Sequence, residues 1–205
     1  MTVTSILLIR HGQSTWNQEH RWQGQADPPL ANTGRKQAFA AAGSVGSVDA
    51  VVASPQQRAL ETAVIISDQI GVGPVITVDD LKERDSGDWS GKTRDEIYSQ
   101  WPDWEETGYR PNGWEPDAGF LKRIYSGLNS VVQEFSGGTV LIISHSGVIM
   151  TLERDLGCYE GRIPNLAGRL IKHSGSEFTT EKRMLLIPEN ISTGGENSTG
   201  QTDPL

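Results

Sequence analysis

ILLIRHGQSTWN, residues 6–17, places an arginine and a histidine directly after an aliphatic run. The run at residues 5–9 has no alternating polar positions, which is typical of a strand buried on both faces of a parallel sheet. Residues 49–53 (DAVVA) and 139–143 (TVLII) have the same character. We therefore expect three central strands in a mostly parallel sheet.

The connecting segments have helical character and predict helices on both sides of this sheet. Ser54 is predicted to be the N-cap of the second helix, because Pro55 suits a first helical position and Gln57 completes a capping box. Strand and helix alternate, so we expect an α/β fold, a three-layer α/β/α sandwich. The expected helices are residues 33–45, 55–70, 118–135 and a segment beginning near Gly147.

Two late segments and one long excursion complete the expected domain. Residues 166–173 and 177–187 interleave polar and apolar residues, as strands near a sheet edge do. Residues 84–117 hold four tryptophans among glycines, prolines and charges. We expect this part to be a lid-like excursion over one end of the sheet, with one short helix near residues 93–101.

We expect a single domain over residues 1–188. Residues 189–205 are polar, rich in Gly, Ser and Thr and without periodicity, which predicts a flexible tail.

Bulk composition narrows the partners and the compartment. A formal net charge of −8 argues against a broad nucleic-acid surface, so any anion site must be local. The only cysteine, Cys158, cannot form an internal disulfide, which favours the cytoplasm. No apolar stretch approaches the roughly 20 residues that cross a bilayer, and the uncharged start does not look like a signal peptide. We expect no membrane contact.

Polar residues leave the carboxyl ends of all three predicted central strands, where ligands bind in parallel sheets. Arg10 and His11 follow the first strand, Arg58 lies shortly after the second, and His145 and Ser146 follow the third. One Arg-His pair alone is typical of a solvated loop, but a second histidine at the same sheet edge is not. Guanidinium forks and helix N-termini suit a dianion such as a phosphoryl group.

Two other chemistries fit these residues poorly. A metal site is disfavoured because no H-x-x-x-H or Cys-rich spacing is present and the arginines would repel a cation. A serine hydrolase is disfavoured because residues 143–147 (ISHSG) have Ile where a nucleophile elbow needs Gly, and His at the nucleophile position. We expect neither a metal nor a cofactor.

Six stretches resemble, in order, the motifs of the histidine phosphatase superfamily, the phosphoglycerate mutase-like proteins. They extend from about residue 6 to 170 and read LLIRHGQSTWN, RWQGQADPPLANTGRKQA, SPQQRALETA, LKERDSGDWSG, ISHSGVI and IPNLAG.

The resemblance implies that His11 attacks phosphorus and becomes a phosphohistidine, while Arg10 and Arg58 hold the phosphate. It also implies that His145 donates to the phosphoryl oxygens. A neutral imidazole is a competent nucleophile, and four positioned donors can replace a metal ion in stabilising charge.

Further positions follow from the same resemblance. Asn17 matches a polar position near the phosphate, and Gln23 and Gly24 match a loop beside it. Ser146 stands where the family usually has Gly, next to the phosphate pocket. Asn165 matches the Asn of the last motif, where a structural and a functional role remain equally open.

The resemblance places the general acid at Glu83, which would protonate the leaving oxygen and then activate water. We expect the incoming dianion to raise the pKa of Glu83, because like charge disfavours the ionised carboxylate. Asp85 and Asp88 are rivals in the same stretch, although a solvated loop role is favoured for each.

Residues 83–91 are closer to the phosphatase pattern of the family than to the mutase pattern E-R-x-Y-G-x-L-x-G-L-N. Residues 117–119 (DAG) replace the Gly-Glu-Ser of many family phosphatases, so substrate contacts from that motif do not transfer. We expect a metal-independent phosphomonoesterase acting on a small phosphorylated metabolite. A cofactor-dependent phosphoglycerate mutase is the alternative, and a non-catalytic phospho-ligand-binding domain is less favoured.

The excursion raises two questions that the sequence leaves open. Its aromatic surface, with Trp22 nearby, suits an apolar or ring-bearing leaving group, although packing within the loop explains each tryptophan equally well. Lys92, Arg94 and Arg110 are candidates for binding a second acidic group, although exposed salt bridges are favoured. The sequence also leaves open the substrate and whether the chain forms a homodimer.

Overall fold

A six-stranded sheet forms the centre of the computed structural model, which describes residues 2–188 and 191. The strand order is β3-β2-β4-β1-β5-β6. The strands are β1 (Val3–Arg10), β2 (Ala50–Ala53), β3 (Ile76–Thr77), β4 (Thr139–Ser144), β5 (Ala167–Ser174) and β6 (Glu177–Leu185). The helices are α1 (Thr15–Gln18), α2 (Asn32–Ala42), α3 (Gln57–Ile70), α4 (Arg94–Gln100), α5 (Trp104–Thr107), α6 (Asp117–Glu134) and α7 (Ser146–Asp155).

The three predicted central strands are parallel neighbours. Strand β4 lies between β1 and β2 and is parallel to both, with Arg10 opposite Ser144 and Ala53 opposite Ile143. Strands β5 and β6 extend the sheet beyond β1 as an antiparallel pair. The mostly parallel sheet and the edge position of the late strands are therefore confirmed, and all three central strands end at the same edge.

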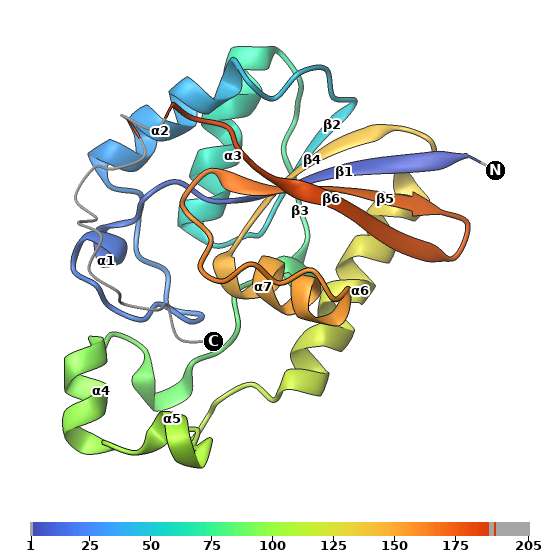
Figure 1. Cartoon of the computed structure of the whole chain (residues 1–205). Helices are drawn as coiled ribbons and strands as arrows, with labels where there is room; N and C mark the ends of the chain where they lie inside the picture. Colours follow the sequence, from blue (N-terminus) through green and yellow to red (C-terminus); the bar gives the residue numbers. More distant parts are fainter. Residues whose placement is uncertain (1, 189–190, 192–205) are drawn as a thin grey trace.

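Alternate residues of each central strand face different helix layers, which confirms the three-layer architecture. Ile6 and Leu8 pack in the cluster that includes Phe120 of α6 and Ile149 of α7. Residues Leu7 and Ile9, along with others on the opposite face, pack with α2 and α3. The two helix pairs lie on opposite sides of the sheet (Figure 1). Burial on both faces explains why these strands are aliphatic throughout.

Helix α3 begins later than its sequence predicts. It starts at Gln57, and Gln56, which has extended backbone, is its N-cap residue. The Ser54 hydroxyl lies 2.8 Å from Nε2 of His145 and does not cap the helix. The N–H of Gln57 instead donates to the Asp27 carboxylate at 2.6 Å. The predicted capping box is wrong, because the carboxylate of Asp27, from a distant loop, accepts the hydrogen bond at the start of the helix.

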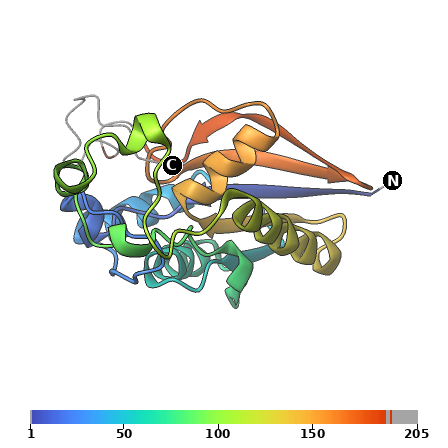
Figure 2. The ribbon, with the colours of Figure 1, turned by 90° about the horizontal axis from the view of Figure 1, so that it is seen from below.

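The excursion lies at the end of the sheet where the central strands finish (Figure 2). The short helix predicted near residues 93–101 is α4, which Thr93 caps through a capping box with Glu96. Trp89, Ile97 and Trp104 form a small core of their own, and Trp22 packs against it. This core gives the segment a packing centre separate from the sheet.

The predicted tail, residues 189–205, lies outside the described residues apart from Ile191. The single domain over residues 1–188 stays a prediction. None of the helices in the described part of the chain is long and apolar enough to cross a membrane.

The first turn of α2 lies against the loop that follows β1. A Cβ added at Gly34 would lie 2.1 Å from the carbonyl oxygen of Gln13. We expect Gly34→Ala to lower the free energy of unfolding by about 1 to 3 kcal/mol, because the helix must move away from this loop. Urea unfolding measures the change.

Gly43→Ala is the matched control at the other end of α2. A Cβ there meets nothing closer than 3.9 Å, and the backbone has right-handed helical angles. It should change stability by less than about 0.5 kcal/mol. Equal effects of the two substitutions would contradict the steric explanation.

Candidate active site

One cavity lies where the central strands end, and it brings together the predicted site residues other than His145. Some of its lining was predicted from the sequence: Arg10, His11, Asn17, Gln23, Gly24, Arg58, Glu83 and Ser146. The rest was not assigned to the site: Arg21, Trp22, Arg84, Ser86, Trp114, Gly147, Thr151 and Arg154. The predicted residues that follow the three central strands, other than His145, therefore meet in one cavity.

His11 is held as a neutral imidazole with one nitrogen available. Its Nδ1 lies 2.6 Å from the carbonyl oxygen of Gly12. A carbonyl only accepts, so Nδ1 bears the proton and Nε2 keeps its lone pair. Burial lowers the pKa of His11 well below its ordinary value, and the charges of Arg58 and Arg10 lower it further. Nε2 is thus an unprotonated nitrogen at neutral pH.

Two arginines bring positive charge to the same end of the cavity. Arg10 is buried and donates from Nη1 to the carbonyl oxygen of Ile163 at 2.6 Å. Arg58 is also buried and donates to the carbonyl oxygens of Gly24 at 3.0 Å and Ala26 at 2.8 Å. Burial lowers the pKa of Arg58 to about 10, so it stays cationic at neutral pH. Both guanidinium groups are fixed by backbone carbonyls before any ligand binds.

His145 lies behind His11 and is not part of the cavity lining. The two rings meet edge to face, with their centroids 5.2 Å apart. Burial lowers the pKa of His145 well below its ordinary value, and Arg58 and His11 add to the effect. Ser54 lies against Nε2, whereas Nδ1 is buried with no hydrogen-bond partner among the described residues. If the Ser54 hydroxyl donates to Nε2, Nδ1 bears a proton that is ready to be donated.

Glu83 lies across the cavity, at the N-terminus of α7. Its Oε2 accepts from the N–H of Gly147 at 3.0 Å, and the Ser146 hydroxyl lies 3.4 Å away. Its Oε1 accepts from its neighbour's backbone, the N–H of Arg84, at 2.8 Å. A Cβ at position 147 would lie 2.2 Å from this carboxylate, so only glycine allows the approach.

The rival carboxylates lie elsewhere. Asp85 accepts from the N–H of Gly87 at 2.9 Å, and Asp88 is exposed. Neither lines the cavity. The loop role that the sequence favours for both agrees with this placement.

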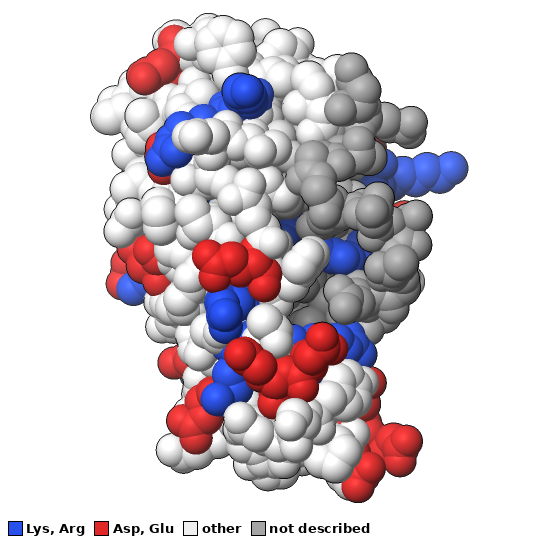
Figure 3. Space-filling model, turned by 90° about the vertical axis from the view of Figure 1, so that its left-hand side faces the viewer, with Lys and Arg blue, Asp and Glu red and all other residues white. Residues whose placement is uncertain are grey.

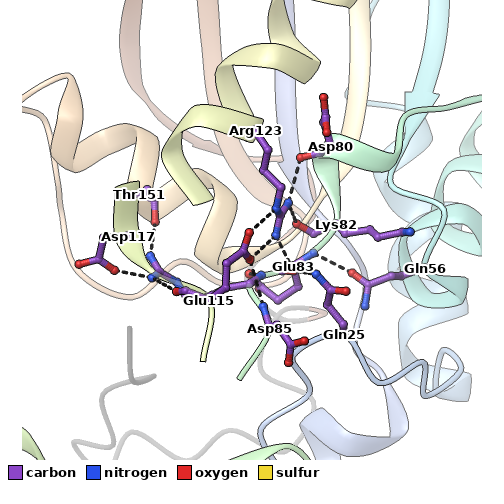
Figure 4. A network of polar contacts seen from close by, with 11 residues as sticks. Gln25, Gln56, Asp80, Lys82, Glu83, Asp85, Glu115, Asp117, Arg123 and Thr151 are labelled. Carbon is purple, nitrogen blue, oxygen red and sulfur yellow. Dashed lines mark hydrogen bonds and ion pairs between the residues drawn. The ribbon is translucent and has the colours of Figure 1, made fainter. Parts of the chain in front are cut away.

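Backbone contacts and a half-buried ion pair hold Glu83 in place, and the sequence reasoning missed them. Arg123 donates to the Glu83 carbonyl at 2.9 Å and pairs with Glu115 at 2.6 Å (Figure 4). The amide oxygen of Gln56 accepts from the Glu83 N–H at 2.7 Å, and its nitrogen donates to the Gly24 carbonyl at 3.1 Å. The Gln56 side chain therefore joins the loop at Gly24, which also holds Arg58, to the backbone of Glu83. No local sequence pattern predicts this contact.

Asn17, Gln23 and Asn165 have well-defined partners. Asn17 forms a capping box with Ser14 at the start of α1, and Ser14 also donates to Oε1 of Gln23 at 2.7 Å. Asn165 donates to the carbonyl oxygen of His11 at 2.8 Å. Of the two roles left open for Asn165, this contact is a structural one that fixes the backbone of His11.

The excursion contributes only part of its aromatic surface to the cavity. Trp114 lines the cavity together with Trp22, which lies outside the excursion in the sequence. Trp89 and Trp104 are buried and pack against each other, with ring centroids 4.8 Å apart. Arg94 pairs with Glu105, the salt-bridge role that the sequence favours. Lys92 is absent from the lining of the described cavities.

Charge on the outer surface beside the site is mixed. On the face shown in Figure 3, Lys and Arg side chains lie among Asp and Glu side chains, without forming one continuous basic area. Guanidinium groups gather inside the cavity instead, in a chain with a net charge of −8. The positive charge here is local, as the composition predicts for any anion site in this chain.

Comparison with known proteins identifies the family. Residues 6–182 match the model of the histidine phosphatase superfamily (branch 1). The chain is 35% identical over 185 residues to the uncharacterized phosphatase PhoE of Bacillus subtilis, covering 88% of this chain and 91% of that protein. The chain therefore belongs to the histidine phosphatase superfamily, which confirms the predicted family.

Two further comparisons agree with this assignment. The bifunctional protein Rv2228c of Mycobacterium tuberculosis is 37% identical over 163 residues, which are 75% of this chain and only 44% of that protein. The structure of Bacillus stearothermophilus YhfR superimposes with a TM-score of 0.75 at 31% identity, covering 86% of this chain and 95% of that one. The predicted phosphoglycerate mutase-like fold is confirmed.

The two buried histidines make stability depend on pH. Their pKa values are lowered in the folded state, so below about pH 6.5 the unfolded chain takes up protons that the folded chain does not. The free energy of unfolding should therefore fall as the pH falls, by about 1 to 3 kcal/mol for the pair between pH 7.5 and 5.5. Urea unfolding at both pH values measures it.

His145→Asn should remove about half of this pH dependence, whatever it does to stability at pH 7.5. His20→Asn, at an exposed histidine, is the control and should leave the dependence unchanged. The pH dependence of the unfolding free energy would then not come from the buried pair if it differed between wild type and the control, or if His145→Asn left it unchanged.

Proposed function

We propose that this chain is a metal-independent phosphomonoesterase that acts through a phosphohistidine on His11. The observation on which the proposal rests is the state of His11: neutral, with Nδ1 bonded to the Gly12 carbonyl and Nε2 available. Arg10 and Arg58 stand beside it as fixed cations. Family membership supports phosphoryl chemistry at this site.

In the first step Nε2 of His11 attacks phosphorus, and the bond from phosphorus to the ester oxygen breaks. Arg10 and Arg58 stabilise the charge on the phosphoryl oxygens, and His145 adds to this when Ser54 donates to its Nε2 and its unpartnered Nδ1 therefore bears the proton. The leaving oxygen takes a proton from Glu83. The products are an alcohol, a phosphohistidine and an ionised Glu83.

In the second step water attacks phosphorus and gives a proton back to Glu83. The bond from phosphorus to nitrogen breaks, inorganic phosphate leaves, and His11 returns to its neutral form. The hydrogen bond from Nδ1 to Gly12 keeps the ring in one orientation through both steps, so little reorganisation is needed.

The positive charge that a metal would supply is already present as guanidinium groups. Their donors lie in fixed positions against backbone carbonyls, and a cation placed between them would be repelled. Among the described residues no group of three or more His, Cys, Asp or Glu side chains is arranged to hold a metal ion. These features support a mechanism without a metal.

Hydrolysis of p-nitrophenyl phosphate in excess EDTA tests the proposal. We expect turnover between about pH 5 and 7 that EDTA does not reduce, and an acid-labile phosphoprotein when the reaction is quenched. His11→Ala should abolish the label and lower kcat by at least about a thousandfold, because it removes the nucleophile.

Inhibition by EDTA would overturn the metal-free mechanism. A label that persists in His11→Ala would show that another residue is the nucleophile. Incubation with 3-phosphoglycerate tests the mutase alternative, since transfer to the neighbouring hydroxyl without release of phosphate would identify a mutase.

Glu83→Gln tests the acid directly. A glutamine oxygen still accepts from the Gly147 N–H, and the side chain loses only the contact with the Arg84 N–H, so the fold should be kept although no proton is delivered. We expect kcat/KM for glycerol 3-phosphate to fall about 100- to 10,000-fold. With p-nitrophenyl phosphate, whose leaving group needs little protonation, the first step should survive and release a burst of nitrophenolate. Rapid-quench kinetics measures both.

Asp85→Asn is the matched control, because an asparagine oxygen can still accept from the Gly87 N–H. Its kinetics should stay within about threefold of wild type for both substrates. A larger loss in Asp85→Asn than in Glu83→Gln would reassign the acid.

A further inference from the structure

The cavity continues past the phosphoryl end along one face of α7. Gly147, Thr151 and Arg154 all line it and are spaced four and three residues apart. This spacing places them on one helical face. At 1.5 Å per residue, the backbone of Arg154 lies about 10 Å beyond that of Gly147, and helical side chains point back toward the N-terminus. The Arg154 guanidinium is therefore directed toward the part of the cavity that lies between Gly147 and Arg154.

Arg154 is a half-buried cation that is incompletely paired. Its Nη2 is buried and has no hydrogen-bond partner among the described residues. Within that part of the chain no carboxylate forms an ion pair with it either, and its guanidinium stacks on the Tyr159 ring at 3.8 Å. A buried donor without an acceptor is destabilising, so such a group is typically kept for a ligand.

The neighbouring cations are already neutralised. Arg84 pairs with Asp117 and stacks on Phe120 at 4.4 Å. Arg21 pairs with Glu19 at 3.0 Å. Arg10 and Arg58 belong to the phosphoryl end. The outer part of the cavity therefore holds about one uncompensated positive charge, that of Arg154.

A second cavity meets the first at this point. Both are lined by Arg84, Trp114, Thr151 and Arg154, and the second continues toward Arg110. Its wall therefore combines an aromatic surface, a hydroxyl group, the three guanidinium groups of Arg84, Arg110 and Arg154, and the two carboxylates of Asp117 and Asp155, so that one positive charge remains in excess. A substrate that enters with its phosphate against His11 must place its leaving group along this wall.

We propose that Arg154 binds a carboxylate on the leaving-group portion of the phosphate ester, with Arg84 and Thr151 beside it. This inference rests on the proposed function, because it concerns the same substrate. One uncompensated charge matches a carboxylate better than a second phosphate, which bears about −1.5 to −2 at neutral pH. The planar guanidinium also suits the two carboxylate oxygens.

Two esters that differ at one group test the proposal. 3-Phosphoglycerate has a carboxylate where glycerol 3-phosphate has a hydroxymethyl group. We expect wild type to favour 3-phosphoglycerate in kcat/KM by about 10- to 100-fold, as charged hydrogen bonds do. Arg154→Met should remove most of this preference and change kcat/KM for glycerol 3-phosphate less than about threefold. Arg154→Lys should restore part of it, because it keeps the charge.

Lys36→Met is the matched control, since it removes one positive charge from an exposed position on α2, outside both cavities. It should leave the preference unchanged. An equal loss on both esters in Arg154→Met would make Arg154 structural and overturn the proposal, as would a wild type without preference. A stronger preference for propane-1,3-diol bisphosphate would overturn the choice of a carboxylate.

Binding separates this inference from the proposed function. Calorimetry on His11→Ala measures the affinities of both esters without turnover. If wild type hydrolyses neither ester nor p-nitrophenyl phosphate, the proposed function fails. The carboxylate site then still stands if 3-phosphoglycerate binds at least about tenfold more tightly than glycerol 3-phosphate and Arg154→Met abolishes the difference.

Discussion

The parallel pairing of β1 with β4 is the constraint on which the site depends. It sets Arg10 opposite Ser144, and one step further the His11 N–H donates to the Ser144 carbonyl at 2.9 Å. The two histidines therefore leave adjacent strands at the same height, and their rings meet edge to face. If this register slipped by one residue, the side chains of Arg10 and His11 would each move to the other face of the sheet.

Burial sets the chemical state of the two histidines. Both imidazoles are neutral chiefly because they are buried, and the nearby guanidinium charges add to the effect. Backbone carbonyls of Ile163, Gly24 and Ala26 accept from the two arginines and hold their guanidinium groups in place. The proposed nucleophile and its proposed electrostatic partners are thus arranged in the absence of substrate, which is what catalysis by preorganisation requires.

The loop after α7 connects this site to a buried ion-pair network on the far side of the helix. Glu153 is buried and pairs with Arg169 and Arg183. Arg183 also donates to the carbonyl oxygen of Arg162 at 2.8 Å, next to the Ile163 carbonyl that holds Arg10. The network holds the loop, and the loop in turn holds the guanidinium of Arg10. Removing one member of such a pair leaves an uncompensated buried charge.

The sequence by itself determined the layers, the central strands and the strand exits that hold Arg10, His11 and His145, because burial periodicity and strand order are local patterns. The tertiary structure alone decided that Asp27 caps α3, that Ser54 contacts His145, and that Arg123 and Gln56 hold Glu83. It also decided that Arg154 is left without a carboxylate partner among the described residues. These are contacts between residues far apart in the chain, and they depend on how closely packed elements approach one another, which no local pattern specifies.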